Sequence, residues 1–500
     1  MERQFDAQHL SGTLPQHRRA RRGRPAVPDP GAPVRQDRAV AGQRAGPAAA
    51  AAGGDHHPAG AGGLGPGRGH AAGADRAVAA DRHLAARLVR GRAEAGGAAS
   101  PGLRLAGRRV RLLAGLGRGE AAPQAAAGLP KNLALVQALR GVAAIAVVAH
   151  HAIRTFTVKA SAGIVPPALI GAPAFYDSLA FGVDLFFVIS GFIMVYVSGA
   201  YMAADKPILG FLLKRAARIY PIYIIVSLAL IAIKAMNHLT EGASGFDLQP
   251  LRIVTSLLLV PAWNEAGGVQ PILGVGWTLS YELYFYLLFA AAVVVARRAF
   301  FAPLAAFILL AVTAFNLLPG GGTAIASFLA NPIAIEFLFG CLVALAIKRG
   351  ARMPLPWLSI AAASAALFVG PLFVHAEAWR VLVWGLPSAV VVFSAVSLEV
   401  DGKVARTPRL FGLLGDASYS IYLVHILIVG IVGARVGRMV SAAVGTGYAS
   451  TAAVAGIVVL AVLVGVALYF AVERPMADFL AKRIGAYERA RLGRVSKVPA

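Results

Sequence analysis

After residue 132, this chain consists of apolar runs of bilayer length joined by short polar connections. A helix needs about 20 predominantly apolar residues to cross a membrane, and such runs follow one another to the end of the chain. Only 14% of the 500 residues are charged, against about 25% in soluble domains. The pattern predicts an all-α, polytopic membrane protein with about ten transmembrane helices. The predicted helices span residues 133–155, 179–199, 219–236, 277–296, 300–318, 328–347, 357–374, 379–398, 411–434 and 450–472.

The basic residues that flank these runs predict the orientation of the chain. With the N-terminus placed in the cytoplasm, the cytoplasmic loops and tail hold 19 Lys and Arg residues, and the opposite loops hold 7. Cytoplasmic loops of membrane proteins are enriched in Lys and Arg. We therefore expect both termini to be cytoplasmic. Much of the net charge of +24 follows from this topology, so no nucleic-acid partner is expected.

Composition divides the chain into three parts. Residues 1–130 are rich in Ala, Gly, Arg and Pro and contain no Lys, Ile, Asn, Tyr, Trp or Cys. Such a segment lacks the large apolar side chains that form a core. A mis-assigned translation start and a disordered basic tail both remain possible for it. Residues 131–475 form the predicted transmembrane domain, and residues 476–500 form a basic cytoplasmic tail.

The first predicted helix carries ionisable residues at membrane depth. Such residues are costly in a bilayer and indicate function or pairing. Arg140 and His151 are eleven residues apart, which is about 16 Å along a helix and three turns plus about 20°. They therefore share one face of the helix, and His150 is rotated away from that face by about 100°.

Two carboxylates are expected at the level of His151. Asp184 in the second helix and Glu282 in the fourth each lie about 8 Å below the predicted outer end. A carboxylate bonded to one ring nitrogen fixes the histidine tautomer and makes the other nitrogen a better base. We therefore expect His151, Asp184 and Glu282 to form a catalytic group in one cavity. The alternative is an ion-paired network that only joins helices.

Basic residues precede the third predicted helix in the segment GFLLKRAARIYPIY. Arg215 and Arg218 are spaced i, i+3 and therefore share a helix face. Arginine forks match phosphate oxygens, so a phosphate site that includes Arg140 is one interpretation. Ordinary anchoring at the cytoplasmic surface is the other.

Five further polar residues lie in or beside the apolar runs. Glu336 and His425 are predicted within helices, where they bind either a substrate or a neighbouring backbone. Ser190 is a candidate hydroxyl donor. We expect Asp416 to cap the ninth helix and Glu473 to end the last helix at the cytoplasmic face. The single cysteine, in an apolar run, excludes an intrachain disulfide and a cysteine-based metal cluster, and no metal site is expected.

Seven motifs occur in a fixed order along the chain. They are LRGVAAIAVVAHH, FGVDLFFVISGFIM, KRAARIYPIY, GWTLSYELYFY, EFLFG, LGDASYSIYLVH and VERP. The ordered set resembles the acyltransferase-3 family of integral-membrane O-acyltransferases, and the form GVGWTLSYE is similar to its exopolysaccharide-modifying members. The resemblance covers about residues 130–480.

This resemblance implies transfer of an acyl group, usually acetyl, from cytoplasmic acyl-CoA to a hydroxyl of an extracytoplasmic or lipid-linked polysaccharide. The implied setting is the inner (plasma) membrane of a bacterium, with membrane lipid, a carbohydrate acceptor and other polysaccharide-synthesis proteins as partners. Family motif residues fall on Arg140, His151, Asp184, Arg215, Arg218, Trp277 and Glu282. Of these, Arg140, Arg215 and Arg218 are implied to hold the acyl-CoA. Acceptor-binding or structural roles are expected for Trp277, Tyr281, His425, Glu336 and Ser190.

A proton-coupled transporter or exporter of a polysaccharide precursor is the alternative function. Such a protein would also bury Arg, His, Asp and Glu, but it typically shows repeat symmetry. The charged motifs do not recur in the two halves of this chain. Some family members carry an appended esterase-like domain, and about 28 residues follow the last predicted helix here, so we expect any such domain to be a separate protein or absent.

Overall fold

The protein is described by a computed structural model that covers residues 133–317, 322–373, 379–404 and 407–495. Within these ranges the regular elements are helices, and one isolated β-bridge joins Trp263 and Val269. The expectations for residues 1–130 lie outside the described residues. The main helices are α3 (Ala134–Val158), α4 (Pro173–Ser178), α5 (Phe181–Val197), α6 (Gly199–Met202), α7 (Ile208–Glu241), α8 (Pro250–Leu257), α9 (Trp277–Ala296), α10 (Phe301–Leu317), α11 (Ala324–Ala330), α12 (Ile335–Lys348), α13 (Pro356–Val369), α14 (Leu386–Val400), α15 (Arg409–Asp416), α16 (Ser418–Ile428), α17 (Ala434–Ala443), α18 (Gly447–Leu468) and α19 (Arg474–Val495).

Seven of the described helices are long and apolar enough to cross a membrane. An eighth span results if α11 and α12, which meet at a 51° bend, are counted together. The apolar helices Phe301–Leu317 and Pro356–Leu372 are shorter. The all-helical membrane architecture is therefore confirmed, with seven to eight candidate spans among the described residues.

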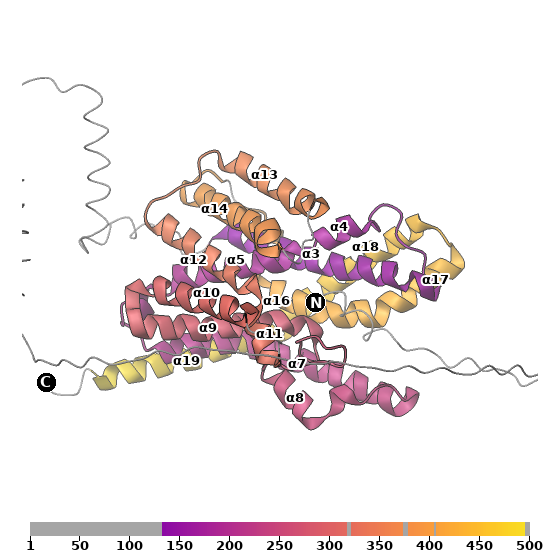
Figure 1. The fold of residues 1–500 in the computed structure, drawn as a ribbon, viewed down its shortest axis with the longest axis horizontal. Coiled ribbons are helices and arrows are strands. Elements are labelled where there is room, and N and C mark those ends of the chain that lie inside the picture. Colours follow the sequence, from indigo (N-terminus) through magenta and orange to yellow (C-terminus); the bar gives the residue numbers. More distant parts are fainter. Residues whose placement is uncertain (1–132, 318–321, 374–378, 405–406, 496–500) are drawn as a thin grey trace, which may run out of the picture. The chain divides into compact units, whose positions relative to one another are not determined.

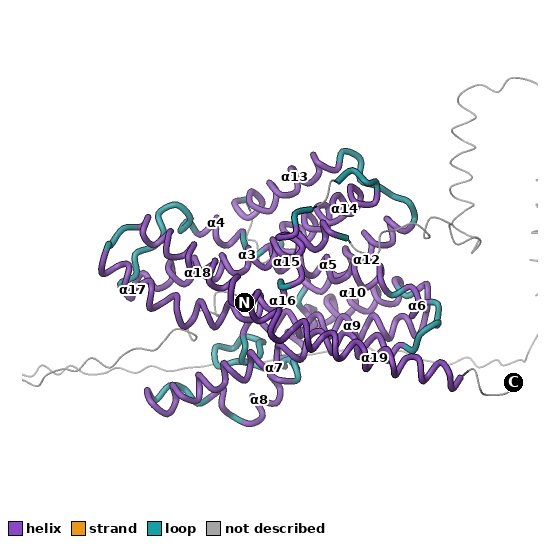
Figure 2. Tube along the Cα trace, turned by 180° about the vertical axis from the view of Figure 1, so that it is seen from behind, coloured by secondary structure: helices purple, strands orange, loops and turns teal. Residues whose placement is uncertain are grey.

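Helices α3, α5 and α16 lie near the centre of the bundle, between α13 and α14 on one side and α7 and α19 on the other (Figures 1 and 2). Glycines bring α5 and α12 into backbone contact. A Cβ atom on Gly191 would lie 2.0 Å from the Phe337 carbonyl oxygen, and one on Gly340 would lie 2.0 Å from the Val188 carbonyl oxygen. Small residues at such crossings allow membrane helices to approach closely.

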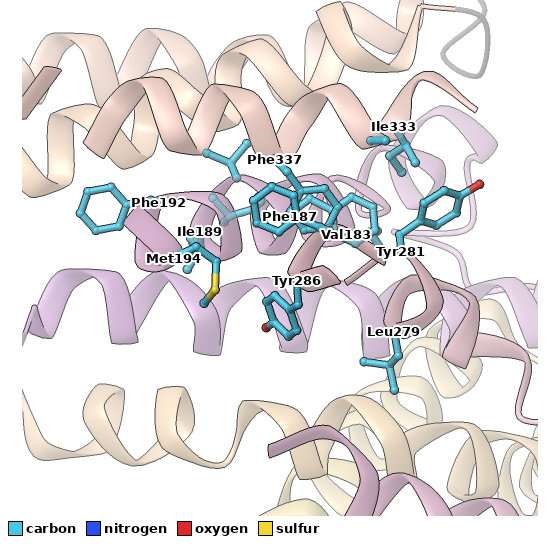
Figure 3. Close-up of a cluster of buried hydrophobic side chains, with 14 of the residues drawn as sticks. Val183, Phe187, Ile189, Phe192, Met194, Leu279, Tyr281, Tyr286, Ile333 and Phe337 are labelled. Carbon is cyan, nitrogen blue, oxygen red and sulfur yellow. The ribbon is translucent and has the colours of Figure 1, made fainter. Parts of the chain in front are cut away.

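Aromatic side chains fill the space beside this crossing. The ring of Phe187 stacks on that of Phe337 with centroids 4.6 Å apart, and Phe285 stacks on the same Phe337 ring at 4.4 Å. Figure 3 shows Phe187 and Phe337 adjacent, with Tyr286 nearby. The core therefore holds α5 in one rotation about its axis, and that rotation fixes where its polar residues point.

The last span does not end at Glu473, contrary to the prediction. A π-helical turn, Tyr469–Glu473, continues α18 into α19. Such a turn, placed directly before Pro475, accommodates a residue that has no N–H group. The buried carboxylate of Glu488 then fixes α19 to the bundle, because it accepts hydrogen bonds from Lys214 Nζ at 2.9 Å and from the Tyr201 hydroxyl at 2.8 Å.

Candidate active site

A cavity of about 60 Å³ lies among α3, α5, α7, α9 and α16. One wall is apolar and includes Val183, Phe186 and Phe187. The polar residues that line the cavity are Arg140, Ser190, Arg218, Thr278, Glu282, Tyr286, Ser418, Tyr419 and Tyr422.

Arg140 is held in this cavity by two side chains. Its Nη1 atom donates to Gln137 Oε1 at 2.7 Å, and its Nη2 atom donates to Ser418 Oγ at 3.0 Å. The side chain is buried. Gln137 in turn donates to Asp416 Oδ1 at 3.1 Å. Asp416 is the last residue of α15 and makes no cap of α16, so the predicted capping role is wrong.

Arg218 lies in the same cavity and faces negative charge. The carboxylates of Glu282 and Glu473 act on both Arg218 and Arg140. Glu473 also accepts a hydrogen bond from Ser420 Oγ at 2.5 Å. Two guanidinium groups and two carboxylates therefore act on one another in this region, with Arg140 buried and the other three residues partly buried.

Glu282 lies with the arginines in the cavity. It accepts hydrogen bonds from Ser190 Oγ at 3.1 Å and from the Tyr286 hydroxyl. The turn that precedes α9, Gly274–Gly276, is buried, so this end of the helix lies inside the protein.

Asp184 points away from the cavity. Its carboxylate accepts two hydrogen bonds from Arg380, from Nε at 2.9 Å and from Nη2 at 2.8 Å, and its side chain is fully buried. Six residues separate Asp184 from Ser190, which corresponds to about 240° of rotation on the helix. Ser190 faces α9, so Asp184 faces a different neighbour.

Glu336 of α12 completes a buried charge cluster with Asp184 and Arg380. The Glu336 carboxyl group lies near enough to act on that of Asp184, and two neighbouring buried carboxyl groups favour a proton on one of them. Neither oxygen of Glu336 accepts from another N–H or O–H group of the described residues. One arginine, one carboxylate and one carboxylic acid would give the cluster no net charge. We name Asp184, Glu336 and Arg380 the sealed cluster.

Three histidines meet at the far end of α3. The ring centroids of His151 and His425 are 5.0 Å apart, and those of His151 and His150 are also 5.0 Å apart. Each of their Nδ1 atoms contacts a backbone carbonyl oxygen. The contact of His151 is with Val147 at 2.9 Å, that of His425 is with Tyr422 at 2.6 Å, and that of His150 is with Tyr176 at 2.7 Å.

A carbonyl oxygen only accepts hydrogen bonds. Each of these Nδ1 atoms therefore carries the hydrogen, and in a neutral ring Nε2 is the hydrogen-bond acceptor. A carboxylate was expected to fix the tautomer of His151, and the Val147 carbonyl oxygen fixes it instead.

Arg140 and His151 both face α16, as their eleven-residue spacing predicts. Arg140 meets Ser418, the first residue of α16, and His151 meets His425, two turns further along. Tyr422 lies between these two contacts. It lines the cavity, and its ring centroid is 5.9 Å from that of His425. The histidines are therefore one aromatic residue away from the arginine cavity.

The remaining predicted residues have packing contacts. The Arg215 guanidinium lies 5.7 Å from the Phe211 ring centroid and 5.9 Å from that of Tyr286. Trp277 packs edge-on against the Phe187 ring at 6.2 Å. Tyr281 stacks on Phe328 at 3.9 Å and donates its hydroxyl hydrogen to the Phe328 carbonyl at 2.8 Å.

The structure therefore separates residues that were predicted to meet. Glu282 joins the arginines, Asp184 joins the sealed cluster, and His151 lies beside His425. Sequence reasoning missed residues that complete these groups. Arg380 falls in the predicted helix 379–398 and was given no role, and Glu473 was expected only to end the last helix. The others that it missed in the cavity are Gln137, Thr278, Tyr286, Ser418, Tyr419 and Tyr422.

An all-helical membrane protein that lines a cavity with arginines and a carboxylate, and gathers histidines beside it, has the arrangement of a polytopic enzyme or transporter. The family model described as "Acyltransferase domain" (Acyl_transf_3) matches residues 134–470, which is well over half of the chain. The chain therefore belongs to the acyltransferase-3 family and is a multi-pass membrane acyltransferase.

Two curated relatives are similar to this chain. The exopolysaccharide production protein ExoZ of Rhizobium meliloti (strain 1021) is 33% identical over 307 residues, which cover 59% of this chain and 89% of the relative. Protein 2 in picA locus of Rhizobium radiobacter is 31% identical over 172 residues, which cover 31% of this chain and 78% of the relative. No solved structure matches the chain.

Proposed function

We propose that this protein transfers an acetyl group from cytoplasmic acetyl-CoA to a hydroxyl of an exopolysaccharide or of its lipid-linked precursor. The family supplies the reaction type, and the name of the relative ExoZ supports the acceptor class. The observation that carries the proposal is the single face of α3 on which Arg140 and His151 both contact α16. It joins an anion-binding group to a base over about 16 Å, a length suited to an elongated donor.

Arg140 and Arg218 would bind the phosphates of the donor. Arginine forks suit phosphate oxygens, and both side chains line the cavity. Glu282 and Glu473 balance the two positive charges in the absence of an anion. Lys214 is bound by Glu488, and Arg215 lies over aromatic rings, so these two residues would support the cytoplasmic entrance.

His151 is the proposed general base. Because Nδ1 contacts the Val147 carbonyl oxygen, Nε2 is the nitrogen that would take the proton from the acceptor hydroxyl. The hydroxyl oxygen attacks the thioester carbonyl carbon, the carbon–sulfur bond breaks, and the proton passes from His151 to the departing CoA thiolate. Asp184, bound to Arg380, would stabilise the scaffold in this mechanism.

A ten-span topology with both termini in the cytoplasm of a bacterial inner membrane accompanies this proposal. The seven long helices, the bent pair and the two shorter apolar helices coincide with the ten predicted runs. This orientation places the Arg140 end of α3 on the cytoplasmic side, where CoA is available, and the His151 end toward the outside.

An apolar cavity beside α3 supports a lipid-linked acceptor. Its volume is about 420 Å³, and it is lined on α3 by side chains from Leu139 to Ala149, the residue before His150. Leu185 of α5 and Phe368 of α13 form other walls. A lipid tail in this space would bring its attached sugar close to the histidines. A lipid-linked oligosaccharide should therefore be acetylated faster than the same oligosaccharide without its lipid.

The test is acetyl transfer by the purified protein in lipid nanodiscs, with labelled acetyl-CoA and extracted exopolysaccharide. His151→Ala should lower the rate by about 10²–10⁴, which is the usual contribution of a positioned acid–base group. His150→Ala is the matched control, because that ring faces Tyr176, and it should lower the rate by less than about tenfold. Normal turnover by His151→Ala would refute the assignment. Movement of saccharide without consumption of acetyl-CoA would favour a transporter.

A further inference from the structure

We propose that His425 is a positioning residue for the base, and that its Nε2 atom accepts a hydrogen bond from His151 once His151 has taken the proton of the acceptor hydroxyl. This inference rests on the proposed function of His151. It assigns a task to a buried group that the mechanism above leaves unused.

His425 is fully buried, and its Nε2 atom has no hydrogen-bond partner among the residues that the structure describes. Buried polar atoms in native proteins are nearly always paired, so each exception needs an explanation. The Nδ1 atom donates to the Tyr422 carbonyl oxygen at 2.6 Å. Nε2 of the neutral ring can therefore only accept a hydrogen bond.

His151 has the same tautomer in the resting protein. Its Nδ1 hydrogen is directed to the Val147 carbonyl oxygen, so its Nε2 is also an acceptor. Two neutral rings of this kind cannot bond through Nε2. A hydrogen bond between them becomes possible only when one Nε2 gains a proton, and His151 is the partly buried member of the pair that a substrate can reach.

The spacing of the rings suits such a bond. Their centroids are 5.0 Å apart, and a hydrogen bond of about 3 Å between two ring nitrogens joins imidazoles at about this separation. The other titratable group that acts on His425 is His150, also from α3. His425 is fixed by Tyr422 and by its place in α16, so a small rotation of His151 would complete the contact.

The bond would stabilise the reacting state selectively. In the resting enzyme it is absent, and in the state with imidazolium at position 151 it is present, so it lowers the barrier without tightening substrate binding. The proton comes from the acceptor hydroxyl, stays on His151 while bonded to His425, and leaves with the CoA thiolate when the carbon–sulfur bond breaks. No oxidant or reductant is needed.

The test compares His425→Phe, which keeps ring volume but removes the acceptor, with His425→Gln, whose amide can donate to Tyr422 and accept from His151. We expect His425→Phe to lower kcat by about 10- to 150-fold, which corresponds to the free energy contributed by a hydrogen bond to a charged group. The KM for acetyl-CoA should be unchanged. His425→Gln should recover most of kcat. Thermal unfolding in detergent should show that both variants are folded.

A double variant distinguishes a positioning role from a structural one. If His425 acts through His151, then His151→Ala with His425→Phe should be no slower than His151→Ala alone. Additive losses, wild-type kcat in His425→Phe, or failure of His425→Gln to recover activity would each overturn the proposal. An active His151→Ala protein would instead refute the base assignment on which it rests.

Discussion

The arginine cavity and the sealed cluster contain the same kinds of charged groups in different surroundings. In the first, Arg140, Arg218 and Glu282 line open space, and Glu473 lies near enough to act on both arginines. In the sealed cluster, Arg380 binds Asp184 directly, and both carboxyl side chains are fully buried. Ionisable residues at membrane depth are therefore not sufficient to define an active site. The distinguishing feature is the space in which a ligand could replace one partner.

The comparison predicts that the sealed cluster matters most for stability. Arg380→Ala leaves a buried carboxylate without its partner, which costs about 3–5 kcal/mol in the free energy of unfolding. Thermal or detergent-induced unfolding of the purified protein measures this. Arg352→Ala is the matched control, because Arg352 pairs with Asp401 at the surface with 30% of its side chain exposed, and it should cost less than about 1 kcal/mol. Equal losses in the two variants would contradict the distinction.

Substitution in the arginine cavity should lower catalytic activity more than it lowers the stability of the protein. Arg140→Ala removes a buried group that would pair with donor phosphate. We expect the free energy of the transition state, relative to free enzyme and acetyl-CoA, to rise by about 2–5 kcal/mol, so that kcat/KM for acetyl-CoA falls roughly 30-fold or more. The unfolding transition should move less than in Arg380→Ala. The measurement is initial acetyl-transfer rate against acetyl-CoA concentration. A variant with normal kcat/KM would remove Arg140 from the donor site.

The smallest effect should come from the protonated member of the sealed cluster. If Glu336 carries the proton shared with Asp184, then Glu336→Gln preserves its shape and charge and should change the free energy of unfolding by less than about 1.5 kcal/mol. Asp184→Asn removes the charge that Arg380 binds and should cost more. The same unfolding assay ranks both variants. A Glu336→Gln protein as unstable as Arg380→Ala would show that Glu336 is the ionised group.

Helical periodicity correctly predicted an all-helical membrane protein and a shared face of α3 for Arg140 and His151. Arg140 and His151 belong to a single continuous helix, so their relative rotation depends only on their spacing. Both contact α16. This relationship needed no knowledge of neighbouring helices.

Relationships between helices could not be obtained in the same way. The position of Glu282 depends on where α9 begins, and that beginning is buried. The partner of Asp184 depends on the rotation of α5, which the Gly191 contact with α12 sets. Glu473 acts on the arginines from a π-helical turn that continues the last span. Each of these features depends on how segments distant in sequence pack together, which the periodicity of a single helix does not predict.

The most direct test of the account is a cryo-electron microscopy structure of the protein in lipid with acetyl-CoA bound. We predict phosphate oxygens within hydrogen-bond distance of the Arg140 and Arg218 guanidinium groups and the thioester beside the His151 ring. Phosphates bound elsewhere, or a thioester remote from His151 and His425, would contradict it.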